Sequence, residues 1–124
     1  MVYRSDFERQ VCEDLESRNV EFKYEPYTLA YTIPQRQRTY LPDLILPNGI
    51  VVELKGWFPL IQRQKMLFVR DSNPNLDIRI VFMKSTVKIH KKSPTTLGKW
   101  CDKNNFKWAE ERIPKRWINE KRKK

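Results

Sequence analysis

The chain has 124 residues, of which 40% are hydrophobic and 12% aromatic, which is the size of one domain with a core of its own. No stretch approaches the roughly 18 apolar residues that span a membrane, and early charged residues do not fit a signal peptide, so neither a membrane span nor a signal peptide is expected. The net charge is +10, and all of it comes from residues 84–124, which contain 14 basic and four acidic side chains. This distribution favours a polyanion such as nucleic acid as the binding partner, and the alternative is a solvated basic tail.

The first third of the chain predicts one helix followed by two strands. Ser5–Glu8 fits the S-x-x-E capping box of a helix start, and apolar residues at helical spacing extend the helix to about Arg18. Alternation of polar and apolar residues predicts a strand over residues 20–24, and strand character returns over residues 27–33. The polar, basic residues 34–39 are the best candidate for a linker or an extended bridge.

The rest of the chain begins with a hairpin. Two apolar runs over residues 40–55 meet at a Pro-Asn-Gly turn. After it, the patterns predict a helix over residues 60–70, a buried strand over 78–82, a helix from Ser93-Pro94 to about Lys103, a short edge strand at 106–108 and a basic segment from Ile113. The order αβββαβα(β)α predicts an α/β domain with a small central mixed sheet flanked by helices.

Three ionisable residues interrupt the apolar strands of the hairpin. Strand side chains alternate between faces, so Glu53 and Lys55 share one face. If residues 40–46 pair with residues 50–55, Asp43 lies opposite them and the three groups converge. Two carboxylates are hard oxygen ligands of the kind that Mg²⁺ takes together with water and phosphate oxygens. A lysine beside them could orient an attacking water or stabilise developing charge.

Each part of this pattern also has a simpler interpretation. A lone Glu-x-Lys on a strand is usually an exposed charged face, and an aspartate after proline is common in turns. The whole pattern is more specific, because Pro42-Asp43 is followed after nine residues by Glu53-x-Lys55 within apolar strands. Together with the basic last third, it predicts a metal-dependent nuclease.

The pattern Pro42-Asp43…Glu53-x-Lys55 resembles the signature of the restriction-endonuclease-like superfamily. Longer segments are similar, in order and spacing, to the phage endonuclease I family, the Holliday-junction resolvases of short-tailed phages. They are RSDFERQVCEDLESRNVEFKYE, YTIP, TYLPDLILPNGIVVELKG, LDIRIVF, SPTTLGKWC and IPKRWI. The resemblance runs from about Arg4 to Ile118 and implies a restriction-endonuclease-like core.

The resemblance also implies a set of site residues. Its catalytic residues correspond to Glu8, Asp43, Glu53 and Lys55. Asp43 and Glu53 are expected to hold the principal Mg²⁺ or Mn²⁺, with Glu8 at a second position and two ions per active site. From the residues alone, Glu8 is better explained as half of the capping box.

The family forms an intertwined homodimer, which the resemblance extends to this chain. Residues 1–32 would be exchanged with the partner subunit, residues 33–38 would form the bridge, and residues 39–124 would form the catalytic core with its basic C-terminal segment. Each active site would then take Glu8 from one subunit and the other three residues from its partner.

The implied activity is Mg²⁺-dependent resolution of four-way junctions and other branched DNA by paired phosphodiester hydrolysis. The alternatives are a non-catalytic nucleic-acid-binding module and a sequence- or mismatch-directed nuclease of the same superfamily. Neither a membrane nor a small-molecule substrate is expected. The protein would act in the cytoplasm, that of a bacterial host if it is phage-encoded.

Basic residues of the bridge and of the last third are the candidates for contacts with DNA, as recognition of DNA shape relies on phosphate contacts. They are Arg36, Arg38, Lys84, Lys88, Lys91, Lys92, Lys115 and Arg116. His90, the single histidine, is better explained as a surface residue or phosphate contact than as a general base. Cys12 and Cys101 lack metal-ligand spacing and are expected to be reduced thiols.

Overall fold

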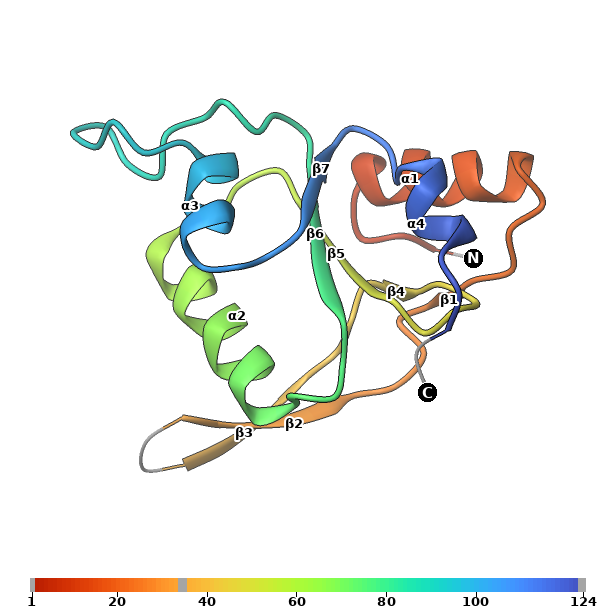
Figure 1. Cartoon of the computed structure of the whole chain (residues 1–124), viewed down its shortest axis with the longest axis horizontal. Helices are drawn as coiled ribbons and strands as arrows, with labels where there is room; N and C mark the ends of the chain where they lie inside the picture. The colour runs from red at the N-terminus through yellow and green to blue at the C-terminus, as the bar shows by residue number, and fades with distance from the viewer. Residues whose placement is uncertain (1, 34–35, 123–124) are drawn as a thin grey trace.

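A computed structural model describes residues 2–33 and 36–122 as an α/β fold with a mixed central sheet (Figure 1). In chain order the elements are α1 (Asp6–Ser17), β1 (Lys23–Tyr24), β2 (Leu29–Ile33), β3 (Arg36–Tyr40), β4 (Leu44–Ile45), β5 (Val51–Lys55), α2 (Leu60–Ser72), β6 (Ile78–Phe82), α3 (Leu97–Lys103), β7 (Trp108–Glu110) and α4 (Lys115–Asn119). The five-stranded sheet has the order β1-β4-β5-β6-β7, and β2 and β3 form a separate two-stranded sheet. The predicted α/β class and mixed sheet are confirmed.

The predicted hairpin is present, but it is shorter than expected. Leu44 pairs with Val52 in antiparallel β4 and β5, and Tyr40 belongs instead to β3. Gly49 closes the turn at φ 91°, a left-handed conformation that glycine adopts without steric cost, and its amide donates to the carbonyl of Leu46. On its other side β5 pairs with β6 in parallel, through a crossover that contains α2.

Helices cover both faces of the sheet (Figure 1). One core, which includes Phe58, Met66 and Trp100, packs α2 and α3 against β5 and β6. The other, which includes Val11 and Trp117, packs α1 and α4 against the opposite face. Because β5 and β6 are covered on both sides, their sequences are nearly continuous apolar runs. Glu53 of β5 and Arg79 of β6 therefore lie in the interior.

Three predicted boundaries are wrong. The strand expected over residues 20–24 is only Lys23–Tyr24. The helix expected from Ser93 begins at Leu97, and its cap is Thr96, whose Oγ1 accepts a hydrogen bond from the amide of Lys99. Thr96 also forms an isolated antiparallel bridge with Lys88, which holds the residues before the helix in a loop. The edge strand expected at 106–108 begins at Trp108, because the amide of Phe106 still bonds to the end of α3.

The polar segment before the hairpin is a strand in this fold. β3 runs antiparallel to β2, with Tyr31 opposite Arg38, and the two strands extend past the end of α2 in Figure 1. The remainder of the predicted bridge, Pro34 and Gln35, lies outside the described residues. Within the described part of the chain, no helix has the length and apolar character needed to cross a membrane. Cys12 and Cys101 are buried free thiols, as expected.

Candidate active site

Asp43 lies in the short segment between β3 and β4, with its carboxylate turned into the protein. Only 2% of its surface is exposed. Its Oδ2 accepts a hydrogen bond from the backbone amide of Leu54 at 2.7 Å, which ties it to β5 across the hairpin. Its Oδ1 lies 2.6 Å from the guanidinium of Arg4. The predicted approach of Asp43 to the opposite strand is therefore confirmed.

Glu53 and Lys55 share one face of β5, as strand alternation predicted. Lys55 Nζ lies 3.1 Å from Glu53 Oε1 and donates to Gln62 Oε1 at 2.6 Å, so α2 helps to orient the ammonium group. The buried hydroxyl of Tyr40 donates to the other oxygen of Glu53. Tyr40 was missed by sequence reasoning, because a tyrosine at the start of an apolar run is ordinarily a core residue. Its position at the end of β3 is set by tertiary structure.

Glu8 reaches the same region from α1. Ser5 caps the helix, and its Oγ accepts a hydrogen bond from the amide of Glu8 at 3.1 Å. The Glu8 carboxylate does not complete the capping box, since its Oε1 accepts instead from the backbone amide of Arg4 at 3.0 Å and from the Tyr24 hydroxyl at 2.5 Å. Half of the capping interpretation is thus correct, and the Glu8 side chain faces the carboxylate of Asp43 through Arg4.

Arg4 joins the carboxylates and was also missed. Its Nη2 lies 2.6 Å from Asp43 Oδ1 and 3.4 Å from Glu8 Oε2, and its Nε lies 2.6 Å from Glu25 Oε1. Burial opposes the charged guanidinium, but a hydrogen bond with Tyr24 and the surrounding carboxylates raise the pKa of Arg4 above its ordinary value. The only sequence signal was an arginine next to the cap of the helix that carries Glu8.

Burial makes it costly to keep the neighbouring carboxylates of Asp43 and Glu53 charged at the same time. Desolvation, and then the charge of Glu53, raise the pKa of Asp43 from 3.8 to about 8. The Leu54 amide, the Lys55 ammonium and the Arg4 guanidinium favour the charged carboxylate and limit the rise. Burial and the neighbouring Glu53 also raise the pKa of Tyr40, so its hydroxyl remains a hydrogen-bond donor. A bound cation would relieve this repulsion between carboxylates.

The donor set fits a hard divalent cation. Asp43 and Glu53 are buried carboxylates held by neighbouring groups, and Mg²⁺ needs only one or two such ligands beside water and phosphate oxygens. Glu8 adds a third carboxylate from α1. Among the described residues, no three Asp, Glu, His or Cys side chains stand close enough to form a complete metal cage. Arg4, Lys55 and Tyr40 instead hold the carboxylate oxygens.

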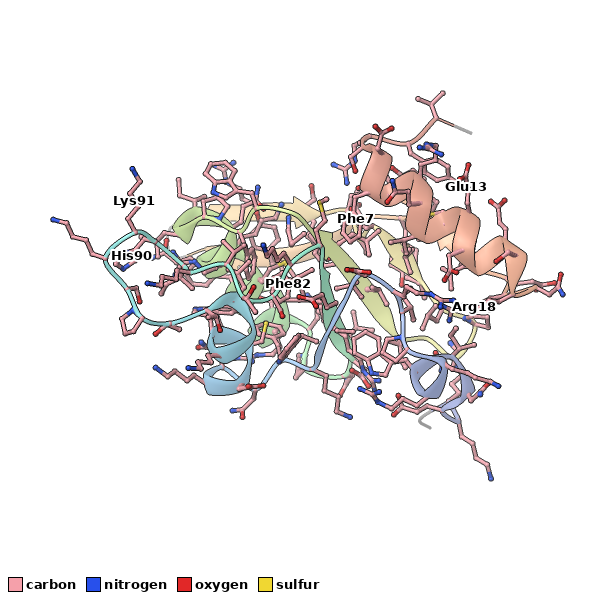
Figure 2. All side chains as sticks on the ribbon, turned by 90° about the horizontal axis from the view of Figure 1, so that it is seen from above. Phe7, Glu13, Arg18, Phe82, His90 and Lys91 are labelled. Carbon is pink, nitrogen blue, oxygen red and sulfur yellow. The ribbon has the colours of Figure 1, made fainter. Side chains whose placement is uncertain are left out.

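The residues predicted to contact DNA do not gather at one place. Arg38 lies exposed on β3, Lys115 and Arg116 lie on α4, and the side chain of Arg36 lies outside the described part of the structure. The others, Lys84, Lys88, Lys91 and Lys92, are exposed on the long connection between β6 and α3. Figure 2 shows Lys91 and His90 on this connection at one end of the molecule, with α1 at the other. His90 is exposed, as predicted.

Concavity does not identify the site. A surface hollow of about 730 Å³ lies between the end of α1, β1 and the β4–β5 turn, and none of the four predicted catalytic residues lines it. What distinguishes the site is that charged groups meet there from three parts of the chain: the hairpin, helix α1, and Arg4, which precedes α1. Perturbed ionisable groups of this kind, rather than hollows alone, are a signal of function.

Two buried carboxylates and a lysine, on β5 and on the segment before β4, lie near a third carboxylate from α1, and such a group is suited to phosphodiester hydrolysis. Comparison with known proteins agrees, because the family model for phage endonuclease I matches residues 1–124. The chain belongs to this family of endonucleases. It is 46% identical over 121 residues to Endonuclease I of Escherichia phage T7, covering 98% of this chain and 81% of that protein. It is 41% identical over 121 residues to Endodeoxyribonuclease 1 of Enterobacteria phage T3, covering 98% and 80%.

Proposed function

We propose that this chain is a metal-dependent, structure-selective DNA endonuclease that resolves four-way junctions and other branched DNA. The observation that carries the proposal is the convergence of Asp43, Glu53 and Lys55, tied together by the hydrogen bond from Leu54 and the contact between Lys55 and Glu53. Family membership and the names of the two phage relatives support a DNA substrate. The proposed place of action is the cytoplasm of a bacterial host.

The side chains divide the chemistry among them. A bound Mg²⁺ or Mn²⁺ would neutralise charge on the scissile phosphate and lower the pKa of a water. Asp43 and Glu53 would hold the principal ion, with Glu8 at the second of two positions. Lys55 is held between Glu53 and Gln62. Its ammonium would stabilise the charge that develops on the phosphate.

The homodimer proposal concerns how α1 reaches the site. In a single chain, α1 packs on its own core, so Glu8 lies beside Asp43 of the same chain. β2 and β3 form the connection between α1 and the catalytic strands. An extended arrangement of the proposed bridge, residues 33–38, would allow residues 1–32 to make the same contacts with a partner subunit, as in domain swapping. Two linked sites would suit paired cuts in one junction.

Basic side chains outside the site would hold the DNA backbone. We propose this role for the exposed lysines of the β6–α3 connection, for Arg36 and Arg38 of β3, and for Lys115 and Arg116 of α4. Their distribution over both ends of the sheet suits a large, branched ligand. Contacts to phosphates fix orientation without reading sequence, and they make affinity depend on salt concentration.

Substrate choice tests the proposal directly. The wild-type protein is expected to cut a four-way junction in Mg²⁺ at least about ten times faster than a linear duplex of the same sequence, and chelation should stop cutting. Cleavage is measured on end-labelled strands. Faster cutting of the linear duplex would reject junction selectivity but retain a nuclease, and cuts at a fixed sequence in every substrate would favour a sequence-directed enzyme. Junction binding without any cutting would favour a non-catalytic module.

Exchange of α1 predicts complementation between inactive subunits. Glu8→Gln and Lys55→Ala chains, unfolded and refolded together, should recover about a quarter of the wild-type active sites, since half the dimers are mixed and each contains one complete site. Nicking of a labelled junction is the measurement. The matched control mixes Asp43→Asn with Lys55→Ala, which should recover nothing because both residues come from the same part of the chain. Equal results for the two mixtures would place Glu8 in the site of its own chain.

A further inference from the structure

A single guanidinium nitrogen occupies the position between two carboxylates that come from different elements. Arg4 Nη2 contacts both Asp43 Oδ1 and Glu8 Oε2, and Nε contacts Glu25. The second oxygen of Glu8 is anchored by Tyr24 and by the backbone amide of Arg4. The second oxygen of Asp43 is anchored by Leu54. In Asp43 and in Glu8, one carboxylate oxygen is thus held by other groups of the protein, and the other contacts the guanidinium of Arg4.

The Arg4 side chain is far more exposed to solvent than that of Arg79, an arginine with a structural role. Arg79 is also held by two carboxylates, but its side chain is only 1% exposed and lies within the protein. The Arg4 side chain is 60% exposed, although Asp43 beneath it is 2% exposed. An exposed arginine in an ion pair can leave for water at a modest cost, which is low enough for a bound metal ion to displace it. The backbone of Arg4 is held by its amide, so only the side chain needs to move.

We propose that Arg4 is an internal counter-ion of the active site, which competes with a divalent cation for Asp43 and Glu8. In the metal-free protein the guanidinium contacts both carboxyl groups, and it must turn outward before a metal ion can reach their oxygens. This inference rests on the proposed metal dependence. It makes Arg4 a positioning residue that sets metal affinity, and it accounts for carboxylates of α1 and of the hairpin lying on either side of one guanidinium.

Metal binding to the DNA-free protein tests the inference. Isothermal titration calorimetry with Mn²⁺, at fixed pH and ionic strength, compares the wild type with Arg4→Gln and Arg4→Lys. Arg4→Gln is expected to bind Mn²⁺ on the order of ten times more tightly, because no side chain has to be displaced. Arg4→Lys, which keeps the charge but not the forked contact, should lie between them. The control is Arg9→Gln, which removes an exposed arginine that pairs with Glu13 on the same helix. Its affinity should match the wild type within about twofold.

Thermal unfolding gives a second measurement that does not depend on activity. Without metal, Arg4→Gln should unfold at a lower temperature than the wild type, because its carboxylates have lost a counter-ion. Saturating Mn²⁺ should raise its unfolding temperature by more than that of the wild type, since binding stabilises the folded state in proportion to the logarithm of affinity.

The outcomes separate the inference from the proposed function. If wild-type Mn²⁺ uptake depends on Asp43 but Arg4→Gln binds no more tightly, the guanidinium does not compete and the inference is overturned while the metal site stands. If the wild type and Asp43→Asn take up equally little Mn²⁺, the proposed metal dependence fails and the inference fails with it. Tighter binding by both Arg4→Gln and Arg9→Gln would reduce the effect to net charge and would also overturn it.

Discussion

Asp43→Asn is expected to lower junction cleavage by at least about 10³-fold, equivalent to about 4 kcal/mol of transition-state stabilisation. The change keeps the size of the side chain and an oxygen that can accept from the Leu54 amide, at 2.7 Å in the wild type. It removes the negative charge proposed to hold the metal ion. Single-turnover cleavage with saturating protein measures the chemical step apart from DNA binding, which should change little.

Asp43→Asn is also expected to change how the stability of the fold depends on pH. Burial, and then Glu53, raise the pKa of Asp43 to about 8 in the folded protein, above its ordinary value of 3.8. The stability contributed by the bound proton is therefore complete below about pH 4 and is lost as pH rises through 8. In metal-free buffer, the wild type should lose on the order of 3–4 kcal/mol of unfolding free energy between pH 5 and pH 8.5 relative to Asp43→Asn, which does not titrate.

A surface carboxylate on α2 provides the control. Asp71, whose side chain is 71% exposed, pairs only with the neighbouring Arg70 among the contacts described. Asp71→Asn should leave both the cleavage rate and the pH dependence of urea unfolding close to wild type. Full cleavage by Asp43→Asn would remove Asp43 from the active site, and parallel stability curves for wild type and Asp43→Asn would show that its carboxyl is not protonated in this range.

Arg79→Met is expected to give the largest loss of stability, roughly 2–3 kcal/mol, because it breaks the network of contacts around a buried guanidinium. Arg79 lies on β6, where its guanidinium contacts Asp77 at 2.7 Å and also holds Glu120, the C-cap residue of α4. It lies over the ring of Trp117 at 5.1 Å as well. The substitution therefore releases the C-terminal segment from the sheet as well as removing a charge.

Urea unfolding followed by tryptophan fluorescence measures this loss. The control is Arg112→Ala, which removes an arginine that pairs with Asp14 at 2.9 Å but is 64% exposed, and which should cost less than about 1 kcal/mol. The hydrogen bond from Arg79 lowers the pKa of Glu120, so this pair stabilises the fold above the ordinary glutamate pKa and less as the pH falls through the lowered value. The difference between wild type and Arg79→Met should accordingly shrink in acid. A cost equal to that of Arg112→Ala would show that Arg79 has no anchoring role.

The part of the site that could be predicted is the part built by local structure. Asp43, Glu53 and Lys55 lie within 13 residues of one another on a hairpin, so strand alternation and one turn fix their relative positions. The helix that carries Glu8 followed from its capping residue and apolar spacing. The approach of Glu8 to the hairpin did not, because 35 residues separate it from Asp43. It was expected from family resemblance alone.

The neighbours that tune the site could not be predicted from spacing. Tyr40 contacts Glu53 only because β3 ends beside β5, and Arg4 contacts Asp43 only because α1 packs on that face of the sheet. Neither residue belongs to a recognisable pattern. The predicted start of α3 was wrong for a similar reason. Ser93-Pro94 is an adequate helix start in isolation, but Thr96, which is bridged to Lys88, is the cap, and α3 begins at Leu97.

By itself, the sequence determined the class of fold, the order of most elements, the uneven charge and the hairpin with its three ionisable groups. Each of these depends on side-chain periodicity or composition, which act over a few residues. Only the tertiary structure decided which carboxylates face one another, that Arg4 lies between them, and how deeply Asp43 is buried. Those properties depend on how α1 and the hairpin pack across the sheet. Contacts between distant segments set the local charge and desolvation that give a carboxylate its chemistry.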